Sequence, residues 1–326
     1  EYIVMSIISL MIAHVKSCSV NRQEMSTTRQ LPRGRERKTM WKGNVMVELR
    51  PEDLNATKPD CLSGTALEQK AESVGLAKTQ MEIGRTIVLA LMAGMLIGSG
   101  ALFMTCVKAD PTLGFAASNI LGGFCFSLGL ICVIVAGAEL FTGNCLMVMG
   151  AASKRFAWAK VLKNWVVVWL GNFAGSLVLV GIVFGCSIMA IKAGDNTIGA
   201  QMVTVASGKI GLDPAQIIFR GIMCNFLVCL AVWMGFAGRT VIDKIFTTIF
   251  PVMAFVAMGF EHCVANMFLL PMGVVAAACG FGTEAQMALC NWGGVFYNIG
   301  FATLGNIIGG CIFVGLVYWF GYRKKA

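Results

Sequence analysis

The chain has 326 residues, of which 57% are hydrophobic and 13% are charged, and its formal net charge is +9. Such a composition lies far from that of a soluble globular domain. Long apolar stretches recur from Thr86 to the C-terminus and predict a protein that crosses a membrane several times. Half of the 26 Lys and Arg residues precede Thr86 and the rest lie mostly at helix ends. The charge therefore favours a membrane surface over nucleic acid as a partner.

Residues 1–62 are expected to form a basic, disordered extension. Its part Val15–Gly43 holds eight Lys or Arg against two Glu. The apolar run Tyr2–Ala13 has no basic region before it and fits a secretory signal poorly. A cleaved targeting segment and an artefact of the assigned start are both open interpretations of it. Residues 63–85 follow, and within them Ser63–Thr79 carries an apolar stripe, which predicts an amphipathic helix on the membrane surface.

Residues 86–322 read as six membrane spans. The second and fifth apolar regions are too long for one straight crossing and too short for two crossings with a loop, so we expect these two spans to be broken. The expected ranges are Thr86–Val107, Ala116–Gly150, Trp165–Ala190, Gln216–Gly238, Ile245–Gly280 and Gly294–Gly321.

The distribution of basic residues predicts the orientation. With the N-terminus in the cytoplasm, the inner connections and the tail at residues 323–326 carry nine Lys or Arg after Thr86, and the outer connections carry four. This agrees with the positive-inside rule, so both termini are placed in the cytoplasm. The inner set is Lys154, Arg155, Lys160, Lys163, Arg239, Lys244, Arg323, Lys324 and Lys325, and the outer set is Lys108, Lys192, Lys209 and Arg220.

Two short segments in the broken spans share the pattern G-x-E-x4-N. One runs from Gly137 to Asn144 and the other from Gly259 to Asn266. A second match follows in the same order, because Leu-Gly-Asn at 170–172 recurs at 304–306. Three spans per half is an odd number, so the second half must be inverted relative to the first. The sequence thus predicts an all-α membrane protein with an inverted 3+3 repeat.

A broken helix leaves free N–H groups at membrane depth, which favours an anion or a polar solute nearby. The residues expected to brace the two breaks are Glu139, Asn144, Glu261 and Asn266. His262 differs from these because its side chain is the one type that titrates near physiological pH. Beside a pore it could give a proton or a hydrogen bond to a weak-acid anion. The alternative is a neutral core histidine with satisfied hydrogen bonds.

The sequence suggests neither a metal site nor a redox cofactor. The 13 cysteines contain no C-x-x-C pair, and His14 and His262 are the only histidines. A bis-histidine haem or a histidine-rich metal centre is therefore not expected, and a membrane redox enzyme is disfavoured. We expect no cofactor, no metal and no enzymatic activity.

Several longer motifs make the chain resemble the formate/nitrite transporter family over roughly Gly64–Tyr322. They are Glu139-Leu-Phe-Thr-Gly-Asn144, Lys163-Asn-Trp with Leu170-Gly-Asn172, the run from Arg220 to Trp233, and Gly259-Phe-Glu-His262-Cys-Val-Ala-Asn266-Met. The resemblance implies an aquaporin-like protomer of six helices, a homopentamer with one pore per subunit, and a place in a lipid bilayer. We expect a multi-pass protein of a bacterial inner (plasma) membrane.

The resemblance also assigns roles to residues. His262 would be the central pore histidine, with Thr142 as its hydrogen-bonding neighbour and Asn225 as a polar contact close by. Lys209 would be the lysine of the outer vestibule that draws anions inward. The cytoplasmic-side constriction would consist of Leu130, Leu140 and Val228, and the outer one of Phe126 and Phe255.

The predicted function is a pore for small monovalent weak-acid anions, assisted by His262. The loop reads Thr142-Gly143-Asn144, closer to hydrosulfide-type members than to enterobacterial formate channels. Formate and nitrite are the first expected substrates, and hydrosulfide and lactate are further candidates. The alternative is a neutral-solute channel of aquaporin or ammonium type. Aquaporins need Asn-Pro-Ala at each break, and here neither Asn144 nor Asn266 precedes a proline.

Overall fold

The computed structural model describes residues 39–42, 45–48 and 61–323. The chain divides into two units, Glu1–Pro59 and Asp60–Ala326. In the first unit, β1 (Thr39–Lys42) and β2 (Val45–Glu48) form an antiparallel pair. The sequence predicts disorder for residues 1–62. Apart from β1 and β2, residues 1–60 of that extension lie outside the described residues.

The second unit is helical, and its described helices are interrupted by three short η segments and one two-stranded pair, β3 with β4. The elements η1 and η2 are 3₁₀ turns, and η3 is a π-helical segment that joins two α-helices. In chain order the elements are α3 (Gly64–Gln80), α4 (Ile83–Lys108), α5 (Phe115–Ala136), α6 (Phe141–Asn144), η1 (Cys145–Met147), α7 (Val148–Ala152), α8 (Trp158–Gly185), η2 (Ile188–Ala190), β3 (Lys192–Ala193), β4 (Asn196–Thr197), α9 (Ile198–Ile210), α10 (Pro214–Ala237), α11 (Val241–Ala257), α12 (Cys263–Ala278), α13 (Glu284–Leu289), α14 (Trp292–Gly310), η3 (Cys311–Leu316) and α15 (Val317–Tyr322).

Five helices in the described part of the chain are long and apolar enough to cross a membrane: α4, α5, α8, α10 and the continuous run from α14 to α15. They match five of the six predicted spans. The remaining one, predicted at Ile245–Gly280, consists of two shorter helices, α11 and α12. The sequence pattern does not predict α9, a helix of 13 residues between the third and fourth predicted spans.

Both predicted breaks are present, and glycine backbone geometry accounts for where they fall. Gly137 caps the end of α5, and the turn after α11 contains Gly259. Both glycines have a left-handed backbone, with φ of +82° and +69°. Such φ values are strained for residues with a Cβ and cost glycine nothing. After each turn a few extended residues lead into a new helix, which starts at Phe141 in the first case and Cys263 in the second.

Close helix contacts are made at glycines. A Cβ on Gly175 of α8 would overlap the carbonyl oxygen of Leu91 in α4. In the other half, a Cβ on Gly309 of α14 would overlap the carbonyl oxygen of Ile222 in α10. Small residues at such positions let membrane helices approach backbone to backbone. The close approach of α4 to α8 and of α10 to α14 therefore depends on glycine, which has no side chain, at the points of contact.

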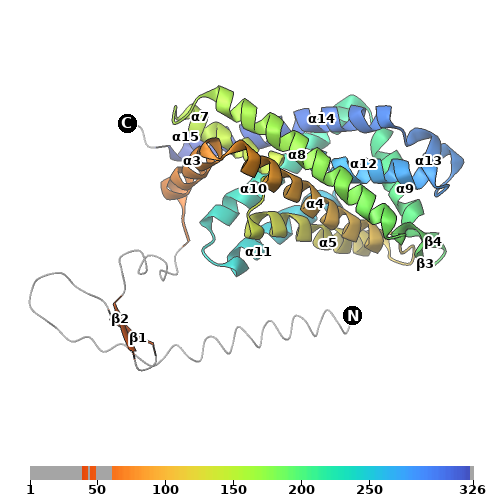
Figure 1. Cartoon of the computed structure of the whole chain (residues 1–326), viewed down its shortest axis with the longest axis horizontal. Helices are drawn as coiled ribbons and strands as arrows, with labels where there is room; N and C mark the ends of the chain where they lie inside the picture. The colour runs from red at the N-terminus through yellow and green to blue at the C-terminus, as the bar shows by residue number, and fades with distance from the viewer. Residues whose placement is uncertain (1–38, 43–44, 49–60, 324–326) are drawn as a thin grey trace, which may run out of the picture. The chain divides into compact units, whose positions relative to one another are not determined.

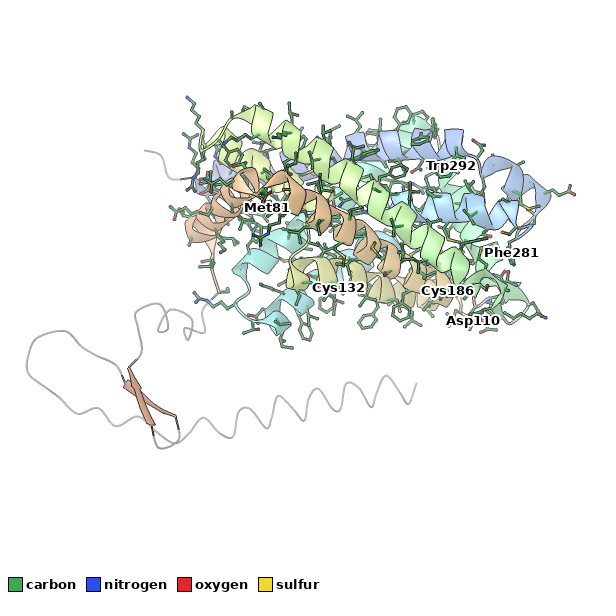
Figure 2. All side chains as sticks on the ribbon, viewed as in Figure 1. Met81, Asp110, Cys132, Cys186, Phe281 and Trp292 are labelled. Carbon is green, nitrogen blue, oxygen red and sulfur yellow. The ribbon has the colours of Figure 1, made fainter. Side chains whose placement is uncertain are left out.

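Helix α12 lies at the centre of the bundle. It packs against α4, α8, α9 and α14, and it is buried on nearly every face. Figure 1 shows α3 and α15 at one end of the bundle and α13, β3 and β4 at the other. In Figure 2, Asp110 and Cys186, which follow α4 and α8, lie at the end opposite Met81. Helices α4 and α8 therefore run in the same direction through the bundle.

Large apolar side chains remain exposed along the outer faces of the long helices, as on Phe103, Phe124, Val166, Phe250 and Phe313. A soluble protein rarely exposes so many, whereas a bilayer solvates them. The sequence predicts this apolar exterior from composition, and the structure places it on the surface.

The predicted amphipathic helix is α3, and its buried face includes two acidic side chains, Glu68 and Glu72. Glu72 binds the Ser153 hydroxyl and Arg155, which donates from Nη1 at 3.3 Å. Burial, a hydrogen bond with Glu72 and the Glu72 charge raise the pKa of Glu68 to about 7. Since the folded pKa lies above the unfolded value, stability from this group is greatest at low pH and falls as pH rises toward 7.

Substituting Gly175 tests the close contact between α4 and α8. Because the added methyl would meet backbone rather than a flexible side chain, Gly175→Ala should destabilise the fold by about 1–3 kcal/mol. The measurement is unfolding of the purified protein in detergent with increasing SDS. Gly181→Ala on the same helix is the control, since no heavy atom lies within 4 Å of its added Cβ. Equal stability of the two variants would contradict the packing argument.

Candidate functional site

The first break is held by a cluster of buried polar side chains. Asn144 donates from Nδ2 to Glu139 Oε2 at 2.8 Å and to Asn164 Oδ1 at 2.8 Å. Asn172 donates to the carbonyl oxygens of Ala90 and Glu139, at 2.8 and 2.9 Å, and its Oδ1 accepts from the N–H of Phe141 at 3.0 Å. The backbone groups that the break exposes are thus bonded to an asparagine from α8.

The second break has the same set of bonds. Asn266 donates to Glu261 Oε2 at 2.6 Å and to Asn298 Oδ1 at 2.7 Å. Asn306 donates at 2.8 Å to the carbonyl oxygens of both Gly221 and Glu261. Its Oδ1 accepts from the N–H of Cys263 at 2.9 Å. Each residue corresponds to one in the first cluster and plays the same part.

Glu139, Asn144, Glu261 and Asn266 are predicted as braces, and the structure places each inside one of these clusters. Asn164 and Asn298 are not among the predicted site residues. A signal for them exists, because Asn164 precedes Asn172 by eight residues and Asn298 precedes Asn306 by eight residues. The cues are the repeated spacing and the repeated Leu-Gly-Asn.

A lysine lies beside each glutamate. Lys209, at the end of α9, donates to Glu261 Oε1 at 2.7 Å, and Lys78, in the last turn of α3, binds Glu139 Oε1. Both glutamates are almost fully buried. A buried carboxylate is costly unless it is paired, and these lysines supply the pairs. Lys209 is a predicted site residue and Lys78 is not, since nothing in the pattern of α3 separates Lys78 from an ordinary lysine at a helix end.

The two breaks meet through Thr142 and His262. Thr142 Oγ1 lies 3.0 Å from His262 Nε2, and both side chains are buried. The other ring nitrogen, Nδ1, accepts a hydrogen bond from the N–H of Ala265 at 3.0 Å and caps α12. An acceptor nitrogen carries no proton, so the neutral ring has its proton on Nε2. In this arrangement His262 donates to the Thr142 oxygen.

Aromatic rings and a small cavity lie on one side of this pair. The ring of Phe255 stacks on His262 at 5.8 Å and meets Phe126 edge to face at 5.6 Å. A cavity of about 90 Å³ reaches His262 from here and is lined also by Phe126, Phe255, Lys108 and Lys209.

A larger cavity lies against the first break. It measures about 350 Å³, and its lining includes Leu130, Leu140, Glu139 and Lys78. Val228 is buried in the same apolar core but is not part of this lining. Asn225 uses its amide to donate to the carbonyl oxygens of Thr142, at 3.3 Å, and Asn306, at 2.7 Å. The structure therefore gives the Asn225 side chain a role in holding the Thr142 loop.

Within residues 39–42, 45–48 and 61–323 there is no group of three or more His, Cys, Asp or Glu side chains that could hold a metal ion. The chemistry available at the junction of the breaks is hydrogen bonding by a hydroxyl and an imidazole, with an ammonium group near each glutamate. These groups suit a small anion or polar solute.

Removing one of the two central asparagines tests the break clusters. Asn306→Ala leaves the Cys263 N–H and two carbonyl oxygens without their partner in an apolar interior, and each such loss costs about 1–3 kcal/mol. We expect a large drop in the unfolding midpoint in detergent, and a similar drop for Asn172→Ala. Gln69→Ala, on the exposed face of α3, is the control. A change no larger than that of the control would show that the clusters do not hold the breaks.

Comparison with known proteins supports this view of the chain. A family model described as formate/nitrite transporter matches residues 65–320. The formate channel FocA of Escherichia coli K12 is 37% identical over 276 residues, which cover 82% of this chain and 96% of FocA. A probable formate transporter of Methanothermobacter thermautotrophicus is 38% identical over 269 residues, covering 76% of this chain and 92% of that protein.

A solved structure described as a pentameric formate channel with formate bound superposes with a TM-score of 0.69 at 38% identity, covering 74% of this chain and 98% of that one. The family match spans the described helical unit from α3 to α15, and it includes both breaks and the Thr142–His262 contact. The resemblance drawn from the motifs is confirmed: the chain belongs to the formate/nitrite transporter family.

Proposed function

We propose that the chain is a channel for small monovalent weak-acid anions, with formate as the first candidate. The observation that carries this proposal is the Thr142–His262 contact. His262 lines the smaller cavity, Leu140 and Gly143 on either side of Thr142 in the chain line the larger one, and both linings include lysines. The relatives described as formate channels favour formate. Nitrite is a second candidate because the family description includes it. Hydrosulfide and lactate are further candidates because they are also small monovalent species.

The proposed path runs between the two cavities. An anion leaves the cavity beside Glu139, passes Leu130 and Leu140, and meets Thr142 and His262. It continues past Phe126 and Phe255 to the cavity beside Lys209, or follows the reverse course. Val228 would add to the first constriction from α10, where it is buried. The apolar rings and side chains on either side of the polar pair would exclude hydrated ions.

The proposed chemistry follows from the hydrogen-bond directions. Because Thr142 Oγ1 accepts from His262 Nε2–H, its own hydroxyl hydrogen is free to be donated. An anion beside Thr142 would accept that hydrogen, and the polarised His–Thr pair makes the donor stronger. An unassisted anion in an apolar constriction is very costly, and picking up one proton removes most of that cost. Lysines near each mouth would raise the local anion concentration.

We further propose six membrane crossings arranged as an inverted 3+3 repeat in an aquaporin-like protomer. In this account, α11 and α12 together make the fifth crossing. The support is the one-to-one match of the two break clusters and of the glycine contacts in α4–α8 and α10–α14. A homopentamer in a bacterial inner membrane with both termini in the cytoplasm completes the proposal, with the pentameric relative and the positive-inside count in its favour.

Flux through proteoliposomes tests the proposed function. Formate uptake should be fast with the wild-type chain and rise as pH falls toward the weak-acid range. In His262→Ala the Thr142 hydroxyl loses the Nε2–H donor that orients and polarises it toward the charged solute. A hydrogen bond to a charged group is worth about 1.5–3 kcal/mol, so uptake should fall roughly 10- to 100-fold. Thr142→Val, which keeps the shape of the side chain and removes the hydroxyl, should fall similarly.

Lys192→Gln is the matched control, since that lysine is exposed in the outer connection and away from both cavities. Full and pH-independent uptake of formate, nitrite, hydrosulfide and lactate by His262→Ala would disprove the role of the histidine. Equal permeation by glycerol or ammonia would favour a neutral-solute channel instead.

A further inference from the structure

The cavity beside the first break is much larger than the solute proposed for this channel. It measures about 350 Å³, against about 90 Å³ for the cavity that reaches His262. By this measure a single water needs only about 10–15 Å³, so the larger cavity has room for many waters. Formate, with three heavy atoms, fills a small part of such a space. Its size alone therefore suits a larger occupant.

The lining of this cavity carries excess positive charge. Three ammonium groups contribute, from Lys70, Lys78 and Lys244, and one carboxylate, from Glu139. Lys78 is paired with Glu139, whose second oxygen accepts from Asn144. Within the described residues, neither Lys70 nor Lys244 makes a side-chain ion pair. Two positive charges thus remain for a ligand.

The positions of the two lysines without an ion pair, Lys70 and Lys244, favour a ligand with more than one negative charge. Lys70 and Lys78 lie eight residues apart on α3 and therefore on one face of that helix. Lys244 lies in the first turns of α11, so it approaches the cavity from a different element. A monovalent anion would engage one of these ammonium groups, whereas an extended multivalent anion can bind both and gain a second charge-assisted contact.

A multivalent anion could bind here but could not pass. Leu130 and Leu140 line this cavity and are buried, and on the proposed path a solute must shed its water to pass them. One proton neutralises formate, but a tricarboxylate or polyphosphate that gains one proton still carries charge, and the cost of desolvating that charge is prohibitive. The anion would remain in the cavity and block the path toward Thr142.

We propose that this cavity is a binding site for multivalent oxyanions of the polycarboxylate or polyphosphate class, which block the pore from the side of α3. The proposal rests on the proposed channel function. The positive-inside count assigns this face to the cytoplasm. Flux from that side would then depend on the multivalent anions of the cytosol.

The probe is citrate, compared with gluconate, a carboxylate of similar size and a single charge, at equal ionic strength. Membrane vesicles of both orientations containing the full chain are loaded with formate, and flux is measured with and without citrate outside. In inside-out vesicles, millimolar citrate should slow flux at least threefold relative to gluconate, and right-side-out vesicles should show no such effect. In the double variant Lys70→Gln/Lys244→Gln, the citrate concentration for half-block should rise at least tenfold.

Each flux is expressed as a ratio to the same variant without citrate, so a change in basal flux cancels. Lys154→Gln, which removes an exposed lysine outside the cavity, should retain the block. Calorimetric titration of the purified full chain with citrate decides binding even if formate flux is absent, which separates failure of this proposal from failure of the channel proposal. Equal effects of citrate and gluconate, or an undiminished block in the double variant, would overturn it.

Discussion

The described helical unit depends on one constraint: backbone groups freed by a break in a membrane helix must find partners without water. Two breaks occur, and each exposes N–H and carbonyl groups in an apolar interior. Asn172 and Asn306 bond those groups from neighbouring helices, and Glu139 and Glu261 are in turn bonded by Asn144 and Asn266. Unsatisfied groups would cost several kcal/mol each, so irregular backbone persists at this depth only because these side chains are present. The cost of two buried carboxylates is offset by Lys78 and Lys209.

The same constraint determines the state of the central histidine. His262 Nδ1 caps α12 by accepting from Ala265, and a doubly protonated ring would place a donor against that N–H. The break therefore favours a neutral imidazole whose Nε2 proton points at Thr142. Under the proposed function, His262 acts on the anion through Thr142, whose hydroxyl becomes the stronger hydrogen-bond donor. Any proton that the anion takes up would then come from water or bulk acid. The two break clusters are nearly the same, yet they bring two different side chains, Thr142 and His262, into contact.

Much of this could be predicted from the sequence, for identifiable reasons. Apolar stretches and the repeated G-x-E-x4-N pattern predict the long helices and both breaks, because hydrophobicity and glycine act locally. The division of the predicted fifth span into α11 and α12 follows from the same pattern. Helix α9 escapes prediction because it is short and only partly apolar, and tertiary packing against α12 stabilises it. The Lys78–Glu139 pair joins residues 61 positions apart, and no local signal records such a contact. Asn225 is predicted as a polar contact near the histidine, and the sequence gives no sign that its amide donates to the carbonyl oxygens of Thr142 and Asn306.

The most direct test of the central claim is the protonation state of the His262 ring. The chain has two histidines, so a His14→Gln variant leaves a single ring to observe by ¹⁵N NMR in lipid bilayers. At neutral pH the account predicts one protonated nitrogen, assigned to Nε2, and one unprotonated nitrogen, assigned to Nδ1, with the Nε2 signal shifting in Thr142→Val. Two protonated nitrogens, or a proton on Nδ1, would contradict it.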